Sequence, residues 1–355
     1  MVEMAIIMLV DMDYFFVACE ELRHPEIKDR PAIVGSDPKG GAGRGVVMTC
    51  NYKAREYGIR SGTPISVAYR LKPDAVFLPL DYDYYETISK AAMDVIKGFS
   101  ERFEQVSIDE AFIDVSGRVG GYGEAEEYAA VIKKAVLDRT RIKCSIGIGP
   151  NKLIAKIACE KAKPDGIKAV NDIEAKSFIA KLDIGEIYGV GEKTRERLRT
   201  MGYETVEQLA KANVMQMVDR FGAFGAELVR YANAIDESAV SENYGVKSIG
   251  REFTFQEDTS NDGSIEAEIE KLSNEVIEEV NRGQLNFRTI TLKLRYEDFS
   301  EHIHSRSIKV TNDLDTLVAT AKELYRSNME KGRKIRKLGV RVSNLVSRKG
   351  QRMIA

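Results

Sequence analysis

Apolar and polar positions alternate with two different periods along the N-terminal half of the chain, and the period indicates which element each segment forms. Strand-like segments are apolar at every second position, whereas helix-like segments repeat every three to four residues. The pattern predicts strands at 6–10, 30–35 and 143–149, a hairpin at 103–115, and helices at 14–23, 83–101, 124–139 and from Asn151 onward. Because strands and helices alternate irregularly and include an antiparallel hairpin, we expect an α+β fold rather than a doubly wound parallel sheet.

Two neighbouring segments contain residues that indicate where elements begin and end. In VVMTCNYKAREYGI a strand is predicted to pass directly into a helix, with Thr49 as the N-cap and Gly58 at the end. The preceding stretch, SDPKGGAGRG, is rich in glycine and is expected to be a flexible surface loop.

The C-terminal half changes character twice. From about 171 to 236 the pattern is helical and punctuated by glycine, 237–247 is polar and typical of a linker, and 248–345 mixes strands with two helical segments. With 355 residues, of which 43% are hydrophobic and 30% charged, the chain is long enough for two to four domains with their own cores.

The composition argues against a secreted, membrane-bound or disulfide-linked protein. The N-terminal apolar run of about seven residues has acidic flanks, which fits a buried strand rather than a signal peptide or a membrane span. The four cysteines are widely spaced and form no C-x-x-C pair, so neither zinc nor a disulfide framework is expected. We therefore expect a soluble cytoplasmic protein with no membrane partner. The net charge of −2 gives no overall sign of a nucleic-acid partner.

Three carboxylates stand at the ends of apolar strands. Asp109 and Glu110 interrupt FEQVSIDEAFIDVS, and because neighbours in a regular strand point to opposite faces, both converge on one target only at a turn or bulge. Asp11 ends the first strand and is a natural neighbour. Oxygen ligands without histidine suit Mg²⁺, and two such ions would stabilise a phosphoryl displacement. Pairs of acidic residues are common on protein surfaces. The hypothesis of a Mg²⁺ site therefore depends on the position of these three acids at the ends of apolar strands.

Two groups of basic and polar side chains fit a phosphate ligand. Tyr52 and Arg55 are three residues apart and share a helix face near Thr49, where they would bind a triphosphate. Lys152, Lys156 and Lys163 fall within about 40° of one another on a helical wheel. A solvated helix face explains these lysines equally well.

Two further segments fit a nucleic-acid backbone. GVGEKT at 189–194 is no Walker A loop, but its two glycines precede a basic helix, as in a helix-hairpin-helix motif; a plain turn between packed helices is the alternative. Residues 331–352 hold nine basic residues and no acidic one. The alternation in IRKLGVRV predicts a basic strand with one buried face rather than a solvated tail.

Taken together, the sequence resembles the Y-family, or translesion, DNA polymerases, most closely the polymerase IV type of archaea and bacteria, over nearly its whole length. The resemblance rests on VDMDYFF (10–16), TCNYKAREYGIRSGTPI (49–65), SIDEAFIDVS (107–116), SIGIGPNKLIAKIACEKAKPDG (145–166), LDIGEIYGVGEKTRERLRTMG (182–202), SIGREFTF (248–255) and IRKLGVRVSNL (335–345). It implies a right-handed polymerase with a ferredoxin-like palm, small fingers, a helical thumb and an α/β little finger. The expected bounds are palm 1–14 and 81–170, fingers 15–80, thumb 171–236, linker 237–247, little finger 248–346 and tail 347–355.

The resemblance also assigns site residues. It makes Asp11, Asp109 and Glu110 the catalytic ligands of two Mg²⁺ ions, with the Met12 carbonyl completing the shell; Thr49, Tyr52, Arg55 and Lys163 bind the nucleotide triphosphate; Phe16 is the steric gate that excludes a 2′-hydroxyl; Val46 and Met48 roof the nascent base pair; and Gly189, Gly191, Lys193, Arg251, Arg333, Arg336, Lys337 and Arg341 contact DNA. It gives no ligand role to Asp13. Met48 is bulkier than many relatives carry, and Tyr188 stands where proline is frequent.

The function implied is template-directed addition of dNTPs to a primer 3′-hydroxyl, of low fidelity and without proofreading, by a monomer that binds primer–template DNA and a sliding clamp. The last nine residues lack the paired aromatics of a clamp-binding peptide, so the chain is truncated or binds a clamp elsewhere. Two alternatives remain. A nucleotidyl cyclase would not need the glycine hairpin or the basic strand, and a noncatalytic DNA-binding protein would not need the three carboxylates.

Overall fold

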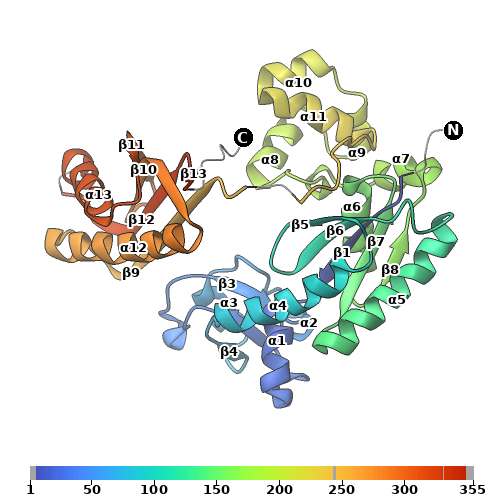
Figure 1. The fold of residues 1–355 in the computed structure, drawn as a ribbon, viewed down its shortest axis with the longest axis horizontal. Coiled ribbons are helices and arrows are strands. Elements are labelled where there is room, and N and C mark those ends of the chain that lie inside the picture. The colour runs from blue at the N-terminus through green and yellow to red at the C-terminus, as the bar shows by residue number, and fades with distance from the viewer. Residues whose placement is uncertain (1–4, 243–244, 331, 349–355) are drawn as a thin grey trace. The chain divides into compact units, whose positions relative to one another are not determined.

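The computed structural model describes residues 5–242, 245–330 and 332–348. They form two compact units, one made of most of the chain up to Glu242 and the other mainly of the residues that follow it. Figure 1 shows the elements of both units. No helix of the described residues is long and apolar enough to cross a membrane.

The first unit is built around a five-stranded sheet. Its strand order is β5 (Arg102–Gln105), β6 (Glu110–Asp114), β1 (Ile7–Met12), β7 (Cys144–Gly149) and β8 (Ile167–Ala169). The central strand β1 pairs antiparallel with both β6 and β7, and all six of its residues are buried. A strand buried on both faces needs cover on each side.

Helices supply that cover (Figure 1). Met8 and Val10 face a core with α4 (Tyr82–Lys97) and α5 (Tyr122–Thr140). Ile7 and Leu9 point the opposite way, toward α6 (Lys152–Ala162). Because side chains alternate along a strand, Asp11 also faces α6, which is the helix that carries the lysines of the sequence.

The close packing of α6 on the sheet depends on glycine. A Cβ atom at Gly147 in β7 would lie 2.0 Å from the carbonyl oxygen of Ala155 and 2.2 Å from the nitrogen of Cys159. No side chain fits there unless α6 moves away from the sheet.

A smaller sheet lies beside the first. Its order is β3 (Val47–Cys50), β2 (Ala32–Gly35) and β4 (Val76–Leu78), and its neighbours in the sequence are α1 (Phe15–Arg23), α2 (Tyr52–Arg55), α3 (Ile65–Leu71) and two 3₁₀ turns at Pro25–Ile27 and Lys39–Gly41. Ile33, Val47 and Ile59 are among the residues of its separate small core.

The rest of the first unit is helical. It contains α7 (Asp172–Ala180), a 3₁₀ turn (Ile184–Glu186), α8 (Glu192–Thr200), α9 (Val206–Ala210), α10 (Val214–Phe221) and α11 (Ala223–Ala232). Its core is shared with α6 through residues such as Leu153 and Ile157.

The chain after α11 returns to the large sheet. The Asp236 side chain accepts a hydrogen bond from the Leu153 N–H at the start of α6, over 3.1 Å. Val240 is buried against Ile7 and Leu9. The Ser241 N–H donates to Glu104 at 3.1 Å. Residues 236–241 thus contribute to the core of the first unit.

The second unit is an antiparallel sheet with helices on one face. The strand order is β11 (Glu301–Thr311), β10 (Leu285–Tyr296), β12 (Ile335–Ser343) and β9 (Ser248–Thr259), with β13 (Val346–Ser347) paired to β10. Helices α12 (Asp262–Arg282) and α13 (Leu314–Asn328) bury Leu292, Leu338 and Val340 of this sheet. The predicted α+β fold and the basic strand with one buried face are confirmed.

The structure corrects three local predictions. The N-cap of α2 is Asn51, whose side chain accepts from the Ala54 N–H at 3.1 Å, whereas Thr49 lies within β3. Lys163 lies just after α6, so it does not share a helical stripe with Lys152 and Lys156. Lys152 is buried and forms an ion pair with Glu104, so it is not solvated.

The four cysteines are all buried and unpaired. Cys144 and Cys159 lie in the core around the large sheet, Cys19 on α1 and Cys50 in the small sheet.

Candidate active site

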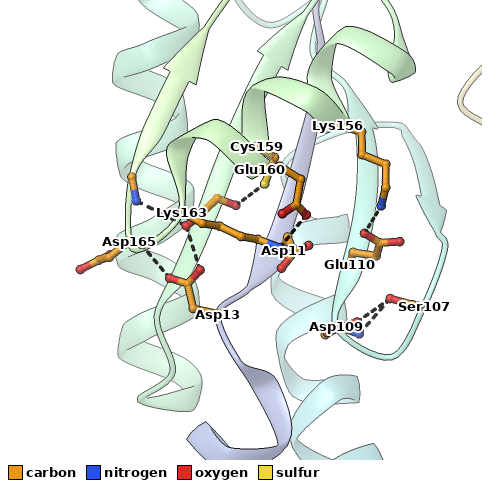
Figure 2. Close-up of polar contacts among 12 residues, drawn as sticks. Asp11, Asp13, Ser107, Asp109, Glu110, Lys156, Cys159, Glu160, Lys163 and Asp165 are labelled. Carbon is orange, nitrogen blue, oxygen red and sulfur yellow. Dashed lines mark hydrogen bonds and ion pairs between the residues drawn. The ribbon is translucent and has the colours of Figure 1, made fainter. Parts of the chain in front are cut away.

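Two adjacent strands bring the three predicted carboxylates to one end of the large sheet. Asp11, near the end of β1, lies opposite Glu110, the first residue of β6. The Met12 N–H donates to the Asp109 carbonyl at 2.9 Å. The antiparallel pairing places the end of one strand beside the start of the other (Figure 2).

Asp109 lies in the turn before β6, as the sequence predicted. The Val106 and Ser107 N–H groups both donate to the Glu110 carbonyl, which closes the turn. The Ser107 hydroxyl donates to the Asp109 carboxylate at 2.6 Å. The turn therefore lets Asp109 and Glu110 lie at the same end of the sheet.

Lysine side chains pair with two of these carboxylates. Lys163 Nζ lies 2.8 Å from Asp11 Oδ2 and 2.8 Å from Glu160 Oε1. Lys156 Nζ lies 2.7 Å from Glu110 Oε2, as Figure 2 shows. Sequence reasoning placed Lys156 only in a stripe of lysines and missed this pair.

Burial governs the electrostatics at Asp11. It raises the pKa of Asp11 to about 7, although the Lys163 ammonium acts in the opposite direction. Burial alone would lower the pKa of Lys163, but the ion pairs with Asp11 and Glu160 raise it, so this lysine stays protonated. The carboxylate thus carries its charge less readily than an exposed one, and a cation bound to it would favour the charged form.

The donor set fits a hard divalent cation. It consists of carboxylate oxygens and a main-chain carbonyl, the ligand types that Mg²⁺ prefers. In the described parts of the chain no three histidine, cysteine or acidic side chains already form a ligand shell. Asp11, Asp109 and Glu110 are turned toward Lys163, Ser107 and Lys156, respectively.

Asp13 has different surroundings from Asp11 and lies in the turn directly after β1. It is buried and accepts hydrogen bonds from the Ser145 hydroxyl at 2.9 Å and from the Asp165 N–H at 2.7 Å. Asp13 thereby fixes the turn that follows Lys163. Its oxygens are already used within the protein.

Tyr52 and Arg55 share one face of α2, as predicted. The Arg55 guanidinium lies 4.6 Å from the centre of the Tyr52 ring, and its Nε donates to the Cys50 carbonyl at 3.3 Å. The Tyr52 hydroxyl lies 3.5 Å from Asp13 Oδ1, which places it beside the turn that follows β1. Thr49 precedes them on β3 and is partly buried.

Phe16 is almost fully buried in the first turn of α1. Its ring stacks on Tyr85 of α4, with centroids 4.7 Å apart and an interplanar angle of 18°. The Tyr85 hydroxyl donates to Glu20 at 2.7 Å. Sequence reasoning missed this support, because Tyr85 is one of three tyrosines within four positions of α4.

Val46 and Met48 flank the buried Val47 and are exposed by 39% and 42%, respectively. This alternation leaves both side chains on the open side of the small sheet, where they are free to meet a ligand.

The predicted thumb residues surround the start of α8. Gly189 has a φ of 84°, a value that favours glycine, and Gly191 is the N-cap of α8. Lys193 lies in the first turn and is exposed. Tyr188 is half exposed, and its ring lies 5.6 Å from Lys156 Nζ.

Most of the predicted DNA-contacting cations of the second unit have acidic partners. Arg333 pairs with Glu330 and Asp298, Arg336 with Asp258, Lys337 with Glu252, and Arg251 with Glu275 and Glu279 of α12. Arg341 is exposed on the side of the sheet away from the helices.

Comparisons with known proteins match this architecture. The family model described as the impB/mucB/samB family matches residues 10–160, its C-terminal domain matches 246–354, and the family's HHH motif matches 174–203. The chain is 43% identical to DNA polymerase IV 2 of Methanosarcina mazei, over 98% of this chain and 94% of that protein. It is 42% identical to DNA polymerase IV of Methanoculleus marisnigri, over 96% and 94%.

Solved structures agree with these relatives. A chimera described as the Y-family DNA polymerase Dbh-Dpo4(243-245)-Dbh superimposes with a TM-score of 0.88 at 30% identity, covering 96% of this chain and 99% of the chimera. The relatives favour neither a nucleotidyl cyclase nor a noncatalytic DNA-binding protein. A match of this coverage across both units shows that the chain belongs to the impB/mucB/samB family and is a Y-family, translesion DNA polymerase of the polymerase IV type.

Proposed function

We propose that Asp11, Asp109 and Glu110, with the main-chain carbonyl of Met12, hold two Mg²⁺ ions during template-directed DNA synthesis. One observation carries the proposal: the pairing of β1 with β6 brings these groups together at the end of a buried sheet. The ions would supply charge neutralisation at the attacking and leaving oxygens of the phosphoryl displacement.

We assign the triphosphate of the incoming dNTP to Lys163, Arg55, Tyr52 and Thr49. Lys163 pairs with Asp11 at 2.8 Å, the Tyr52 hydroxyl lies 3.5 Å from Asp13, and the Arg55 guanidinium lies 4.6 Å from the Tyr52 ring. Charged donors bind phosphate oxygens more strongly than neutral ones. Lys163 would exchange its contact with Asp11 for the substrate, and Asp13 would hold the turn that carries Lys163.

We assign selection of the sugar to Phe16. Its ring is fixed by stacking on Tyr85, which is itself anchored by Glu20. A ring that cannot turn away excludes an additional 2′-hydroxyl by contact alone. Val46 and Met48 are the exposed side chains that we expect above the nascent base pair.

DNA binding is assigned to the glycine hairpin before α8 and to the second sheet. Gly189, Gly191 and Lys193 present main-chain N–H groups and a cation at a helix start, which suits a phosphate. Arg341 and its neighbours offer cations on the open face of the second sheet. Phosphate contacts carry no base information, so the sequence of the template should hardly affect affinity.

We further expect a monomer that acts in the cytoplasm together with a sliding clamp. Four buried cysteines without disulfides support a reducing setting. The clamp-binding prediction concerned the C-terminal residues, and 349–355 lie outside the described residues.

Primer extension by metal-site variants tests the proposal. Asp109→Ala and Glu110→Ala should each lower extension of a labelled primer by at least about 10²-fold, since charge stabilisation at the reacting phosphate is lost. Affinity for the duplex should change little, because the DNA is bound by other residues.

Glu126→Ala on α5 is the matched control, because this exposed acid lies on a helix outside the site. It should extend primers at the wild-type rate. Near-normal extension by either metal-site variant contradicts the assignment of the carboxylates.

A further inference from the structure

The open face of the second sheet combines cations with carboxylates. Strand register places Lys337 of β12 opposite Arg295 of β10, and Arg295 opposite Glu301 of β11. One pair further along, Glu252 of β9 lies opposite Gly339, which lies opposite Lys293. The face therefore carries Lys293, Arg295, Lys337 and Arg341 together with Glu252 and Glu301.

Glu252 reaches across the neighbouring strand. Its carboxylate pairs with Lys337 of β12 and, 3.0 Å away, with Lys293 of β10, so it spans three strands. Gly339 lies beneath it: a Cβ atom at this position would come within 2.9 Å of the Glu252 side chain. The absence of a side chain at 339 leaves the carboxylate room to lie flat on the sheet.

The ion pairs extend from Glu252 to the edge strand. Lys293 also lies 3.1 Å from Glu301, which accepts two hydrogen bonds from Arg295 at 2.6 and 3.1 Å. Partial burial by itself raises the pKa of Glu252, but hydrogen bonds from Lys337 and Lys293 lower it below its ordinary value. The carboxylate is therefore charged at neutral pH.

Arg341 differs from the other three cations. It is exposed, no ion pair holds it in the described part of the chain, and it borders a hollow of about 310 Å³ lined also by Glu252, Thr291 and Lys293. A phosphate that enters this hollow meets one available guanidinium and one ammonium that Glu252 already neutralises.

We propose that Glu252 is a built-in competitor of phosphate, which occupies Lys293 and Lys337 and so limits the affinity of this face for DNA. The inference rests on the proposed function, in which the open face binds the backbone of primer–template DNA. A bound phosphate either displaces the carboxylate from the lysines or contacts Arg341 alone.

The salt dependence of binding tests the proposal in the full-length chain. Affinity for a fluorescent primer–template is measured between about 50 and 300 mM salt, where each neutralised phosphate contributes about −0.9 to the logarithmic slope. Glu252→Gln keeps the shape of the side chain and removes its charge. It should bind about five- to tenfold more tightly near 0.1 M salt, with a slope steeper by about one unit.

Glu323→Gln controls for net charge. It removes the same charge from α13, where Glu323 pairs with Arg306. Its affinity should stay within about twofold of wild type, with an unchanged slope, because released charge on the helical side reaches no phosphate. Equal effects of Glu252→Gln and Glu323→Gln would overturn the proposal.

A second pair of variants decides the matter even if Glu252→Gln folds poorly. Arg341→Gln should flatten the wild-type slope by about one unit, whereas Lys337→Gln should change it much less. If both variants flattened the salt slope equally, Lys337 would already contact phosphate in the wild-type chain, and the proposal that Glu252 competes for it would be overturned. Failure of the wild-type chain to bind DNA at all would instead contradict the proposed function.

Discussion

Asp11 and Asp13 stand only two residues apart, one in β1 and the other in the turn directly after it, and the fold gives them different surroundings. Asp13 accepts hydrogen bonds from the Ser145 hydroxyl and the Asp165 N–H, whereas Asp11 accepts one from the Lys163 ammonium. Periodicity predicts that both lie on one strand face, but β1 ends at Met12 and Asp13 lies in the turn that follows. Which of them is available to a ligand depends on residues more than 130 positions away, and no local pattern contains that information.

The steric gate offers a test at the same scale. Phe16→Ala should admit ribonucleotides, because removing the ring opens space beside the sugar without touching a carboxylate. The measurement is the ratio of rNTP to dNTP incorporation on one template. Truncation of a nearly buried ring that stacks on Tyr85 should also cost about 3 kcal/mol of stability, measured by urea unfolding.

Phe16→Leu separates the two effects, since it keeps apolar contact with Tyr85 but lacks the flat ring. It should be more stable than Phe16→Ala and intermediate in selectivity. Wild-type discrimination by Phe16→Ala would mean that another residue excludes the hydroxyl.

At the scale of elements, the sequence predicted the strands and helices of the large sheet well, because β-branched runs and helical periods are long there. It could not predict the contact between α6 and β7. CSIGIG was predicted only as a strand, but its two glycines mark the place where a helix backbone lies against a strand backbone. The prediction of the α2 N-cap was wrong because it too depends on a contact between elements. Asn51 also accepts a hydrogen bond from the Ala32 N–H of β2 at 3.1 Å.

Gly147→Ala tests the importance of this helix–strand contact. The added methyl group meets the backbone of α6, so the helix has to shift and carry Lys156 away from Glu110. We expect a loss of about 2 kcal/mol or more in urea unfolding and slower primer extension.

Gly123→Ala is its control. A Cβ atom at this glycine in α5 would meet no other atom within 4 Å, so alanine should leave stability unchanged or raise it by up to about 1 kcal/mol. A wild-type unfolding midpoint for Gly147→Ala would show that α6 moves without cost.

At the scale of the whole molecule, several of the basic residues that cluster in the sequence are paired with acidic residues in the folded protein. The 331–352 stretch is basic, which predicted a strong local field, and the alternation in IRKLGVRV correctly predicted the strand β12. In the structure, acidic residues from distant segments form ion pairs with its cations: Asp298 with Arg333, Asp258 with Arg336 and Glu252 with Lys337. Counting charges along a segment therefore overestimates the field that a phosphate meets.

Single variants of this stretch separate binding from folding. Arg341→Ala should flatten the salt slope of DNA binding by about one unit and weaken all template sequences alike. Arg333→Ala should leave the slope unchanged and lower the melting temperature, because Arg333 packs on Tyr296 and joins Glu330 to Ser300. A slope change for Arg333→Ala equal to that of Arg341→Ala would contradict the role given to the ion pairs.

The four buried thiols have a practical consequence. Burial raises the pKa of Cys144 to about 12 and also raises the pKa of the other three, and it is the exposed thiolate that reacts with maleimides and other alkylating reagents. We therefore expect the native protein not to react with such labels, so that no cysteine has to be replaced before labelling. One cysteine introduced on an exposed helix of each unit would carry a pair of fluorophores, and energy transfer between them would follow the two units during each cycle of nucleotide addition.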